Sequence, residues 1–289
     1  FTAVSAECFA LTASPLAVAI GVNGSLGPAE LLPVVEKLAE LSPRPVIVQP
    51  NAGLPDSRGN YSVGAEEFAA YAEKFLGAGA RLIGGCCGTT PEHIRLIARL
   101  AKGRAPAPSR YVPRAAVCSA TKAVFIDGVR VIGERINPTG KKAMKAALLA
   151  GDYNYAAKQA VEQTEAGADI LDVNAGLPGI DEKEVLTELV RRVSSVTDLP
   201  LQIDTSDPAA AESALRAYNG KAVINSVSGE EKSLSAVLPL AAKYGAAVVG
   251  LTVDERGVPK TTEERLEIAE KIIARAAAHG IPETDIYID

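Results

Sequence analysis

The chain has 289 residues, of which 47% are hydrophobic and 22% are charged, and its formal net charge is −5. This composition is typical of a folded globular protein. The acidic balance argues against nonspecific binding to nucleic acid, because no basic face is available to neutralise phosphates. Since no apolar run approaches the length that spans a bilayer, we expect partners that are neither nucleic acid nor membrane.

Strands alternate with helices along most of the sequence. Short apolar runs are each followed by a longer amphipathic stretch, which is the pattern of βα units around a parallel sheet. In the first third we expect strands over residues 16–22, 45–49 and 81–83, and helices over 27–41, 65–76 and 91–101. In the second part we expect strands over 169–173, 201–203, 222–225, 246–251 and 286–288, and helices over 141–150, 152–165, 181–195, 208–217, 230–244 and 262–278.

Residues 104–122 interrupt this alternation. Three prolines between Gly103 and Pro113, with no apolar periodicity, predict a semi-rigid linker. It would separate a first domain over 1–103 from a second over 123–289. The second domain opens with a predicted β-hairpin over 123–132, because Asp-Gly between apolar runs favours a two-residue turn. We expect this hairpin to close the bottom of a barrel.

The expected fold class is therefore α/β, with two tandem TIM-type (β/α)8 barrels that are each only partly present. Both ends of the sequence look cut, because Phe1 is not an initiator residue and the final residues resemble a strand that has just ended. The pentapeptide Asn-Ala-Gly-Leu-Pro occurs at 51–55 and at 174–178, each time after a strand. Related tandem barrels would explain this repeat, and so would chance.

Two adjacent cysteines, Cys86 and Cys87, lie between glycines where a strand gives way to a helix. In a β/α barrel that position is the catalytic rim, and the helix N-terminus favours a thiolate. We interpret the pair as zinc ligands that need at least one more ligand; the alternative is a glycine-rich turn with two buried thiols. His93 is interpreted as a surface or capping residue. Adjacent cysteines seldom pair, so a reducing cytoplasm is expected.

Carboxylates and amides recur where the strands of the second part end. Each alone could be a helix N-cap, but several at one edge of a parallel sheet point into a common cavity. A carboxylate accepts two parallel hydrogen bonds from a flat heterocycle with adjacent N–H donors, and an asparagine can donate and accept beside it. The predicted site residues are Glu134, Asn137, Asp172, Asn174, Asp204, Asn225 and Asp289.

Six segments of the sequence resemble a known family. The segments at 46–55 and at 84–93 (Gly-Gly-Cys-Cys-Gly-Thr-Thr-Pro-Glu-His) resemble the homocysteine-binding module of the cobalamin-dependent methionine synthase family. Those at 133–140 (Gly-Glu-Arg-Ile-Asn-Pro-Thr-Gly), 169–176, 202–206 and 224–229 resemble its pterin-binding module, which corrinoid methyltransferases and dihydropteroate synthase share.

This resemblance implies specific roles for the residues. Cys86 and Cys87 match zinc ligands, while Asp204, Asn225 and Asp289 match residues that hydrogen-bond the pterin ring. Glu134 and Asn137 match the first-strand loop of that site, and Asp172 and Asn174 match its second-strand motif. The implied reaction moves the methyl group of 5-methyltetrahydrofolate via cobalamin to homocysteine, with Asn225 and Asp204 as the catalytic residues that stabilise or relay a proton at N5. Cobalamin would come from another domain or a corrinoid protein, since the sequence has no Asp-x-His-x-x-Gly motif.

One position departs from the family pattern. Where the family has a third zinc cysteine, in the context Gly-x-Asn-Cys-Ser-Leu-Gly-Pro, this chain has Gly24. Glycine offers no ligand atom, so a zinc site would be weaker or would recruit another ligand. Two alternatives therefore stay open: a methyltetrahydrofolate–corrinoid protein methyltransferase with an inactive homocysteine barrel, and a non-catalytic folate-binding module.

Overall fold

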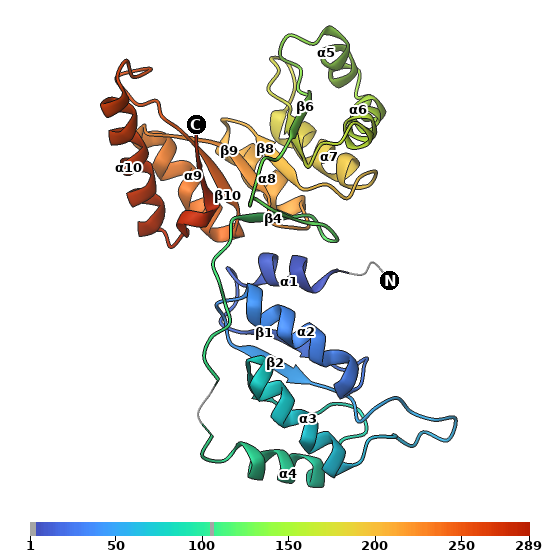
Figure 1. Cartoon of the computed structure of the whole chain (residues 1–289). Coiled ribbons are helices and arrows are strands. Elements are labelled where there is room, and N and C mark those ends of the chain that lie inside the picture. Colours follow the sequence, from blue (N-terminus) through green and yellow to red (C-terminus); the bar gives the residue numbers. More distant parts are fainter. Residues whose placement is uncertain (1–3, 105–106) are drawn as a thin grey trace. The chain divides into compact units, whose positions relative to one another are not determined.

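The computed structural model describes residues 4–104 and 107–289, which divide into two compact units. Unit 1 comprises residues 114–289 together with the N-terminal segment that ends at Cys8, and unit 2 comprises residues 9–113. Each unit contains its own parallel sheet with helices packed on it (Figure 1). The predicted α/β fold with parallel strands is confirmed.

Unit 2 holds a sheet of three parallel strands in the order β1-β2-β3. The strand β1 begins later than predicted, because Leu16 and Val18 are exposed and lie ahead of it. A short helix, α1, precedes β1 and was not predicted; its first residues, up to Cys8, belong to unit 1 and the rest to unit 2. The elements are α1 (Ala6–Ala13), β1 (Ile20–Asn23), α2 (Pro28–Leu41), β2 (Val46–Gln49), α3 (Ala65–Ala78), β3 (Ala80–Ile83) and α4 (Pro91–Ala101).

The helix α3 shows why this unit folds as it does. Phe68 and Phe75 are spaced at two helical turns and are both 1% exposed, so one face of α3 is buried. The helix ends at Gly79, whose φ of 108° is favourable only for glycine. The next residue begins β3, so the tight helix end delivers the chain directly into the strand before the cysteines.

Unit 1 holds a sheet of six parallel strands in the order β6-β7-β8-β9-β10-β11. Predicted and observed bounds agree within a few residues, except that β6 was expected to be half of a hairpin. The elements are β6 (Ile132–Ile136), α5 (Lys142–Leu149), α6 (Tyr153–Glu165), β7 (Ile170–Asn174), α7 (Glu182–Ser194), β8 (Leu201–Asp204), α8 (Pro208–Ala217), β9 (Val223–Ser228), α9 (Glu231–Tyr244), β10 (Ala247–Leu251), α10 (Thr262–Ala278), a 3-10 turn (Glu283–Asp285) and β11 (Ile286–Ile288).

The strand order in unit 1 equals the chain order, and this determines where the helices lie. Right-handed crossovers that always step to the next strand place every helix on the same face of the sheet, as Figure 1 shows for α7 to α10. The other face is then free to curve inward, which is the arrangement of a TIM-type barrel. Within the described residues the sheet stays open, with β6 and β11 as its edges.

A hairpin packs against that second face, but its strands differ from the prediction. The strand β5 (Ala123–Phe125) pairs with β4 (Ala116–Cys118), which precedes it, and not with the residues after Asp127–Gly128. The latter residues continue into β6, and β4 lies within the segment predicted as a linker. The hairpin side chains Val117 and Val124 form a buried cluster with Ile170, Val223 and Ala247, near the beginnings of their strands. The apolar hairpin therefore covers the amino ends of the strands and leaves their carboxyl ends for polar residues.

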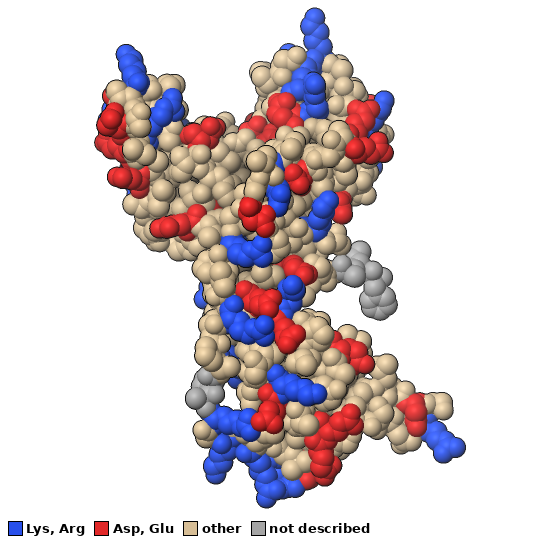
Figure 2. All heavy atoms as spheres, in the orientation of Figure 1, with Lys and Arg blue, Asp and Glu red and all other residues tan. Residues whose placement is uncertain are grey.

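Acidic and basic side chains are interspersed over the visible face of each unit (Figure 2). The formal net charge of the whole chain is −5. In the part of the chain that the structure describes, no helix has the length and apolar character required to cross a membrane.

Candidate functional site

Three polar side chains form one row across the carboxyl ends of β7, β8 and β9. The register pairs Asn174 with Asp204, and Asp204 with Asn225. Residues paired in this way carry their side chains on the same face of a sheet. Asn225 lies two residues after Val223, whose side chain joins the hairpin cluster, so the row lies on the face opposite the helices. The sheet thus brings together three of the predicted site residues.

A second polar layer lies beneath this row. The register pairs Asp172 with Gln202, each two residues before a member of the row and therefore on the same face. Asp172 is only 2% exposed, and its Oδ1 accepts hydrogen bonds from Gln202 Nε2 at 2.6 Å and from Asn225 Nδ2 at 3.4 Å. Sequence reasoning missed Gln202, although its place two residues before Asp204 was a usable signal. The layer forms a buried floor under the row.

Burial perturbs both carboxyl groups of the site. It raises the pKa of Asp172 to about 6, and repulsion from Asp204 and Glu134 adds to the effect while hydrogen bonds from Gln202 and Asn225 oppose it. Burial also raises the pKa of Asp204, and hydrogen bonds with Asn174 and Asp172 counteract this shift. The site is therefore a pair of neighbouring carboxyl groups whose surroundings raise the pKa of each.

The remaining predicted residues of this site have other surroundings. Glu134 is exposed and accepts two hydrogen bonds from Lys141 Nζ, at 2.7 and 2.8 Å. Asn137 is buried, and its Oδ1 accepts from Thr139 N at 2.8 Å, so this atom stabilises a local turn. Asp289 is exposed, and its backbone pairs with β10 through Gly250 O at 2.9 Å. None of these contacts joins Asn137 or Asp289 to the two-layer cluster.

Asn174 has two different contacts. Its Oδ1 accepts from Gly176 N at 2.7 Å, which caps the turn after β7. Asn174 is also paired with Asp204 in the register, and its side chain opposes the rise in the pKa of that carboxyl group. Asn174 therefore caps the turn and lies beside Asp204 in the row.

In unit 2, Cys86 and Cys87 lie on the turn after β3, and backbone contacts determine the shape of that turn. Cys86 N donates to Pro50 O at 2.8 Å, and Ala52 N donates to Cys87 O at 2.9 Å. Cys87 N donates to Asn51 Oδ1 at 3.2 Å. The two Sγ atoms are 3.8 Å apart, Cys87 is exposed, and Cys86 is partly buried. The turn therefore presents both thiols at the carboxyl end of its strand.

The donor set around these thiols does not fit a zinc centre. A zinc site takes three or four protein ligands, and in residues 4–104 and 107–289 no group of three or more His, Cys, Asp or Glu side chains could hold a metal ion. The position that faces the thiols is Gly24, where an added Cβ would lie 3.4 Å from Cys86 Sγ. Position 24, which would carry the third thiol of the family pattern, therefore lies beside Cys86 but has no ligand atom.

His93 belongs to the helix cap, as predicted, and not to the thiol site. Thr90 N donates to His93 Nδ1 at 3.2 Å in a capping box at the start of α4. The Nε2 atom lies 3.2 Å from Val63 O, and the ring packs edge-on against Phe68 at 5.4 Å. Both ring nitrogens of His93 therefore have polar partners within unit 2, and the ring packs against Phe68.

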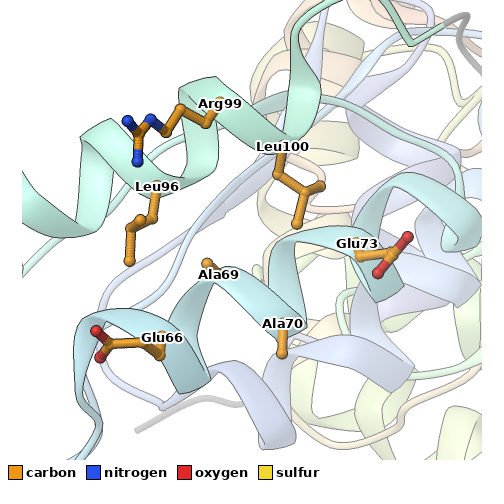
Figure 3. Close-up of a pocket in the computed structure, with 7 residues that line it drawn as sticks. All are labelled: Glu66, Ala69, Ala70, Glu73, Leu96, Arg99 and Leu100. Atoms are coloured by element: carbon orange, nitrogen blue, oxygen red, sulfur yellow. The ribbon is translucent and has the colours of Figure 1, made fainter.

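A groove lies between α3 and α4 on the surface of unit 2 (Figure 3). Leu96 and Leu100 from α4 and Glu66 and Glu73 from α3 contribute to its walls. None of the predicted site residues lines it. The groove is therefore separate from the thiol turn and from the carboxylate cluster.

Each of the two parallel sheets corresponds to a segment that matches a known protein family. Residues 2–101 match the homocysteine S-methyltransferase family. Residues 133–289, more than half of the chain, match the pterin binding enzyme family, and this range begins at β6 and contains the whole two-layer cluster.

The chain belongs to the pterin binding enzyme family. The polar cluster of unit 1 lies within the part that defines this membership, and the thiol turn lies within the part that matches the methyltransferase family.

Two curated relatives extend over both parts. The chain is 35% identical to methionine synthase of Mycobacterium leprae over 288 aligned positions, covering 93% of this chain and 24% of the relative. It is 37% identical to methionine synthase of Mycobacterium tuberculosis over 296 aligned positions, covering 97% of this chain and 25% of the relative. The chain thus spans about a quarter of the length of these relatives, and the recognition of the two modules from their motifs is confirmed.

Solved structures of dihydropteroate synthases also align with this chain. Dihydropteroate synthase from Thermus thermophilus aligns with a TM-score of 0.46 and 26% identity, over 60% of this chain and 64% of that chain. Dihydropteroate synthase from Xanthomonas albilineans in complex with 7,8-dihydropteroate aligns with a TM-score of 0.44 and 23% identity, over 61% of this chain and 64% of that chain.

Proposed function

We propose that this chain provides the folate-binding and homocysteine-binding parts of a methyltransferase in methionine synthesis, which moves the methyl group of 5-methyltetrahydrofolate via cobalamin to homocysteine. The observation that supports this proposal most is the row of Asn174, Asp204 and Asn225 above the buried Asp172. The family match of unit 1 and the two methionine synthase relatives support it as well.

In this proposal Asp204 binds the edge of the pterin ring. A carboxylate has two acceptor oxygens that suit two parallel N–H donors. Asn225 lies beside it in the register and offers an amide to the ring. Departure of the methyl group from N5 is favoured when N5 carries a proton, and carboxylate and amide oxygens close to the ring stabilise that positive charge.

Cobalamin would supply the atom that accepts the methyl group, and we propose that it is bound by another domain or a corrinoid protein. Homocysteine would bind near Cys86 and Cys87 in unit 2. Since the donor set there does not fit zinc, we assign no step of the methyl transfer to a metal ion bound by this chain. We further propose a reducing cytoplasm as the compartment, in which the thiols of Cys86 and Cys87 stay reduced.

The test is binding of 5-methyltetrahydrofolate to the full chain, measured by isothermal titration calorimetry. We expect Asp204→Asn to weaken binding about 100-fold, because an amide replaces one acceptor with a donor that faces the ligand's own donors. Asp198→Asn is the matched control, since Asp198 is an exposed carboxylate before β8, at the opposite end of that strand. Unchanged affinity in Asp204→Asn, or no binding by the wild type, would contradict the proposal.

A second candidate is a methyltransferase that acts only between 5-methyltetrahydrofolate and a corrinoid protein. Gly24 favours it, because the thiol site lacks a third ligand. Methyl transfer to added cobalamin, followed by transfer to homocysteine in a longer protein that contains this chain, separates the two. Homocysteine turnover in that protein would exclude the second candidate.

A further inference from the structure

The strand β6 contains one residue more than its neighbour β7 over the same length. The register pairs Gly133 with Leu171 and Ile136 with Val173, so three steps along β6 match two steps along β7. An extra residue of this kind forms a β-bulge, which interrupts the ladder and changes the direction of the side chains that follow. The β7 residue between these two pairs is Asp172, so the bulge lies opposite the buried floor of the polar site.

The bulge separates two side chains that a regular strand would keep on one face. Residues two apart, such as Glu134 and Ile136, share a face in a regular strand. Here Ile136 is 0% exposed and belongs with Val173 to the core beneath the helices. Gly133 also lies on the helix side, because an added Cβ there would meet Gln163 of α6. Glu134 directly follows Gly133 and therefore points to the opposite face, which is the face of the row.

Gln163 on α6 holds the bulge from the helix side. Its Oε1 accepts from the backbone N of Arg135 at 2.8 Å, and its Nε2 donates to Gln159 O at 3.1 Å. Gln163 is only 8% exposed. A bulge takes a backbone N–H out of the strand ladder, and such a group is costly to bury without an acceptor. The side-chain amide of Gln163 supplies that acceptor.

Gly133 leaves the room that this amide occupies. A Cβ at Gly133 would lie 2.6 Å from Gln163 Oε1 and 3.0 Å from Leu171 Cδ2, so one of these groups would have to move. The end of the Gln163 side chain is the more flexible of the two. A side chain at position 133 would therefore displace the amide from Arg135 N. Gly133 and Gln163 thus act together on the same bulge.

Glu134, which the bulge directs to the face of the row, keeps the capacity to bind a ligand. It is exposed, and its two carboxylate oxygens accept from Lys141 Nζ at 2.8 and 2.7 Å. Because a carboxylate has about four acceptor positions, both oxygens can still accept from N–H donors of a ligand. Burial raises the pKa of Asp172, and repulsion from Glu134 adds to this effect, which agrees with a carboxylate near the floor of the site.

We propose that Gln163 is a positioning residue of the pterin site, which holds the β6 bulge and thereby directs Glu134 toward the ligand while Ile136 stays in the core. This inference rests on the proposed function of the row. Since Gln163 lies on the helix side of the sheet, its effect on binding passes through Glu134. The polar groups that face the ligand then lie on four adjacent strands, from β6 to β9.

Three substitutions test this role, and a fourth is their control. Gln163→Met keeps the length of the side chain but removes the acceptor for Arg135 N, whereas Gln163→Glu keeps an oxygen at that place. Gly133→Ala displaces the amide without changing Gln163 itself. Gln159→Met is the matched control, because the Gln159 side chain lies one turn earlier on α6 and donates to Glu162. The measurement is the affinity of the full chain for 5-methyltetrahydrofolate by isothermal titration calorimetry.

We expect Gln163→Met and Gly133→Ala each to weaken binding about tenfold, since the backbone no longer holds Glu134 in place. Gln163→Glu should restore the affinity to within about threefold of the wild type, because its oxygen accepts from Arg135 N. Gln159→Met should bind like the wild type. Circular dichroism checks the fold of each variant, and Gly133→Ala decides the question if Gln163→Met does not fold.

A double-mutant cycle with Glu134→Ala distinguishes positioning from a general loosening of the fold. Glu134→Ala should itself weaken binding about tenfold, and adding Gln163→Met or Gly133→Ala to it should cost less than about twofold more. A loss that passes through Glu134 disappears when that side chain is absent, whereas a loosened fold costs the same in both backgrounds. The inference is overturned if the loss is equal in both backgrounds, or if Glu134→Ala, Gln163→Met or Gly133→Ala binds like the wild type.

A measurement without ligand tests the bulge contact apart from the proposed function. Amide hydrogen exchange of Arg135, followed by NMR, should be at least about tenfold faster in Gln163→Met and Gly133→Ala than in the wild type and in Gln159→Met. Equal exchange in the wild type and these two variants would overturn the inference. If exchange behaves as expected but the wild type binds no reduced folate, the proposed function fails while the hold of Gln163 on the bulge stands.

Discussion

The two parallel sheets of this chain carry different chemistry at the same edge. In unit 1 the polar groups lie on the strands themselves, and the register of β7, β8 and β9 aligns them. In unit 2 the two thiols lie on the turn after β3, and backbone hydrogen bonds hold them. A site on strands can be buried and built in layers, whereas a site on a turn stays accessible and depends on the path of the backbone.

The difference extends to energetics. The carboxyl groups of unit 1 are buried close to each other, so their environment disfavours charge and raises the pKa values of Asp172 and Asp204. In unit 2, Cys87 is exposed and Cys86 is partly buried, and within residues 4–104 and 107–289 no group of three or more His, Cys, Asp or Glu side chains could hold a metal ion. Three predictions test this comparison, beginning with the largest expected effect.

The largest change is expected from Gly24→Cys, which would give the thiol turn a third ligand. An added Cβ at this position lies 3.4 Å from Cys86 Sγ, so the new thiol starts beside the existing pair. We expect zinc affinity to rise about 100-fold or more, as measured by competition with a chromophoric chelator. Gly24 has a φ of 67°, so any side chain there adds backbone strain.

Gly24→Ser is the matched control for that experiment, because it adds the same strain without a thiol. It should leave zinc affinity at the wild-type level. Equal zinc affinity in Gly24→Cys and Gly24→Ser would mean that positions 24, 86 and 87 do not converge on one point. These three positions would then not form a metal site.

The second prediction concerns the cost of the buried carboxyl group. Asp172→Asn should raise the free energy of unfolding at pH 7.5 by up to about 3 kcal/mol, because a shift of the pKa from 3.8 to about 6 corresponds to that amount. The native state holds the proton to a higher pH than the unfolded state. The wild type therefore loses stability as the pH rises from about 4 to about 6, and the gain from Asp172→Asn shrinks as the pH falls.

Urea unfolding at pH 7.5 and pH 4.5, with Asp198→Asn as the exposed control, measures this gain. The control should change stability by less than about 0.5 kcal/mol at both pH values. An Asp172→Asn protein that is less stable than the wild type at pH 7.5 would contradict this prediction. It would show that neighbouring groups stabilise the ionised carboxylate of Asp172 by more than its burial costs.

The smallest effect is expected at the thiol turn. Cys87→Ala should change the free energy of unfolding by less than about 0.5 kcal/mol, because Cys87 is exposed and its backbone makes the contacts that hold the turn. Asn51→Ala, which removes the acceptor for Cys87 N, should cost about 1–3 kcal/mol. Denaturant unfolding of both variants measures the contrast. A larger loss in Cys87→Ala than in Asn51→Ala would mean that the thiol itself supports the fold.

Much of the fold could be predicted because it depends on local patterns. The helix over Pro91–Ala101 follows from a proline at its start and apolar spacing along it. The strand before Asp204 follows from a short apolar run, and the row of Asp204 and Asn225 follows from the rule that parallel strands end at one edge. These features need no knowledge of which distant residues meet.

Other features could not be predicted, because they depend on contacts between distant residues. The apolar run after Asp127–Gly128 has the composition of a hairpin strand, yet it continues into the large sheet, and β5 pairs with β4 on its other side. The helix α1 has no strong signal of its own. The turn that Asn137 Oδ1 stabilises by accepting from Thr139 N also depends on the local backbone path, while the place of Asn137 at the site stays a prediction.

The sequence by itself determined the alternation of strands and helices, the parallel sheets, and the carboxylates and thiols at the strand ends, because periodicity, caps and turn residues act within a few positions along the chain. Only the tertiary structure decided that Asp172 lies beneath Asp204 and Asn225, that Gln202 joins it, and that Gly24 faces Cys86. These relations depend on strand register and loop path, which are set when distant segments pack together and bury their apolar faces.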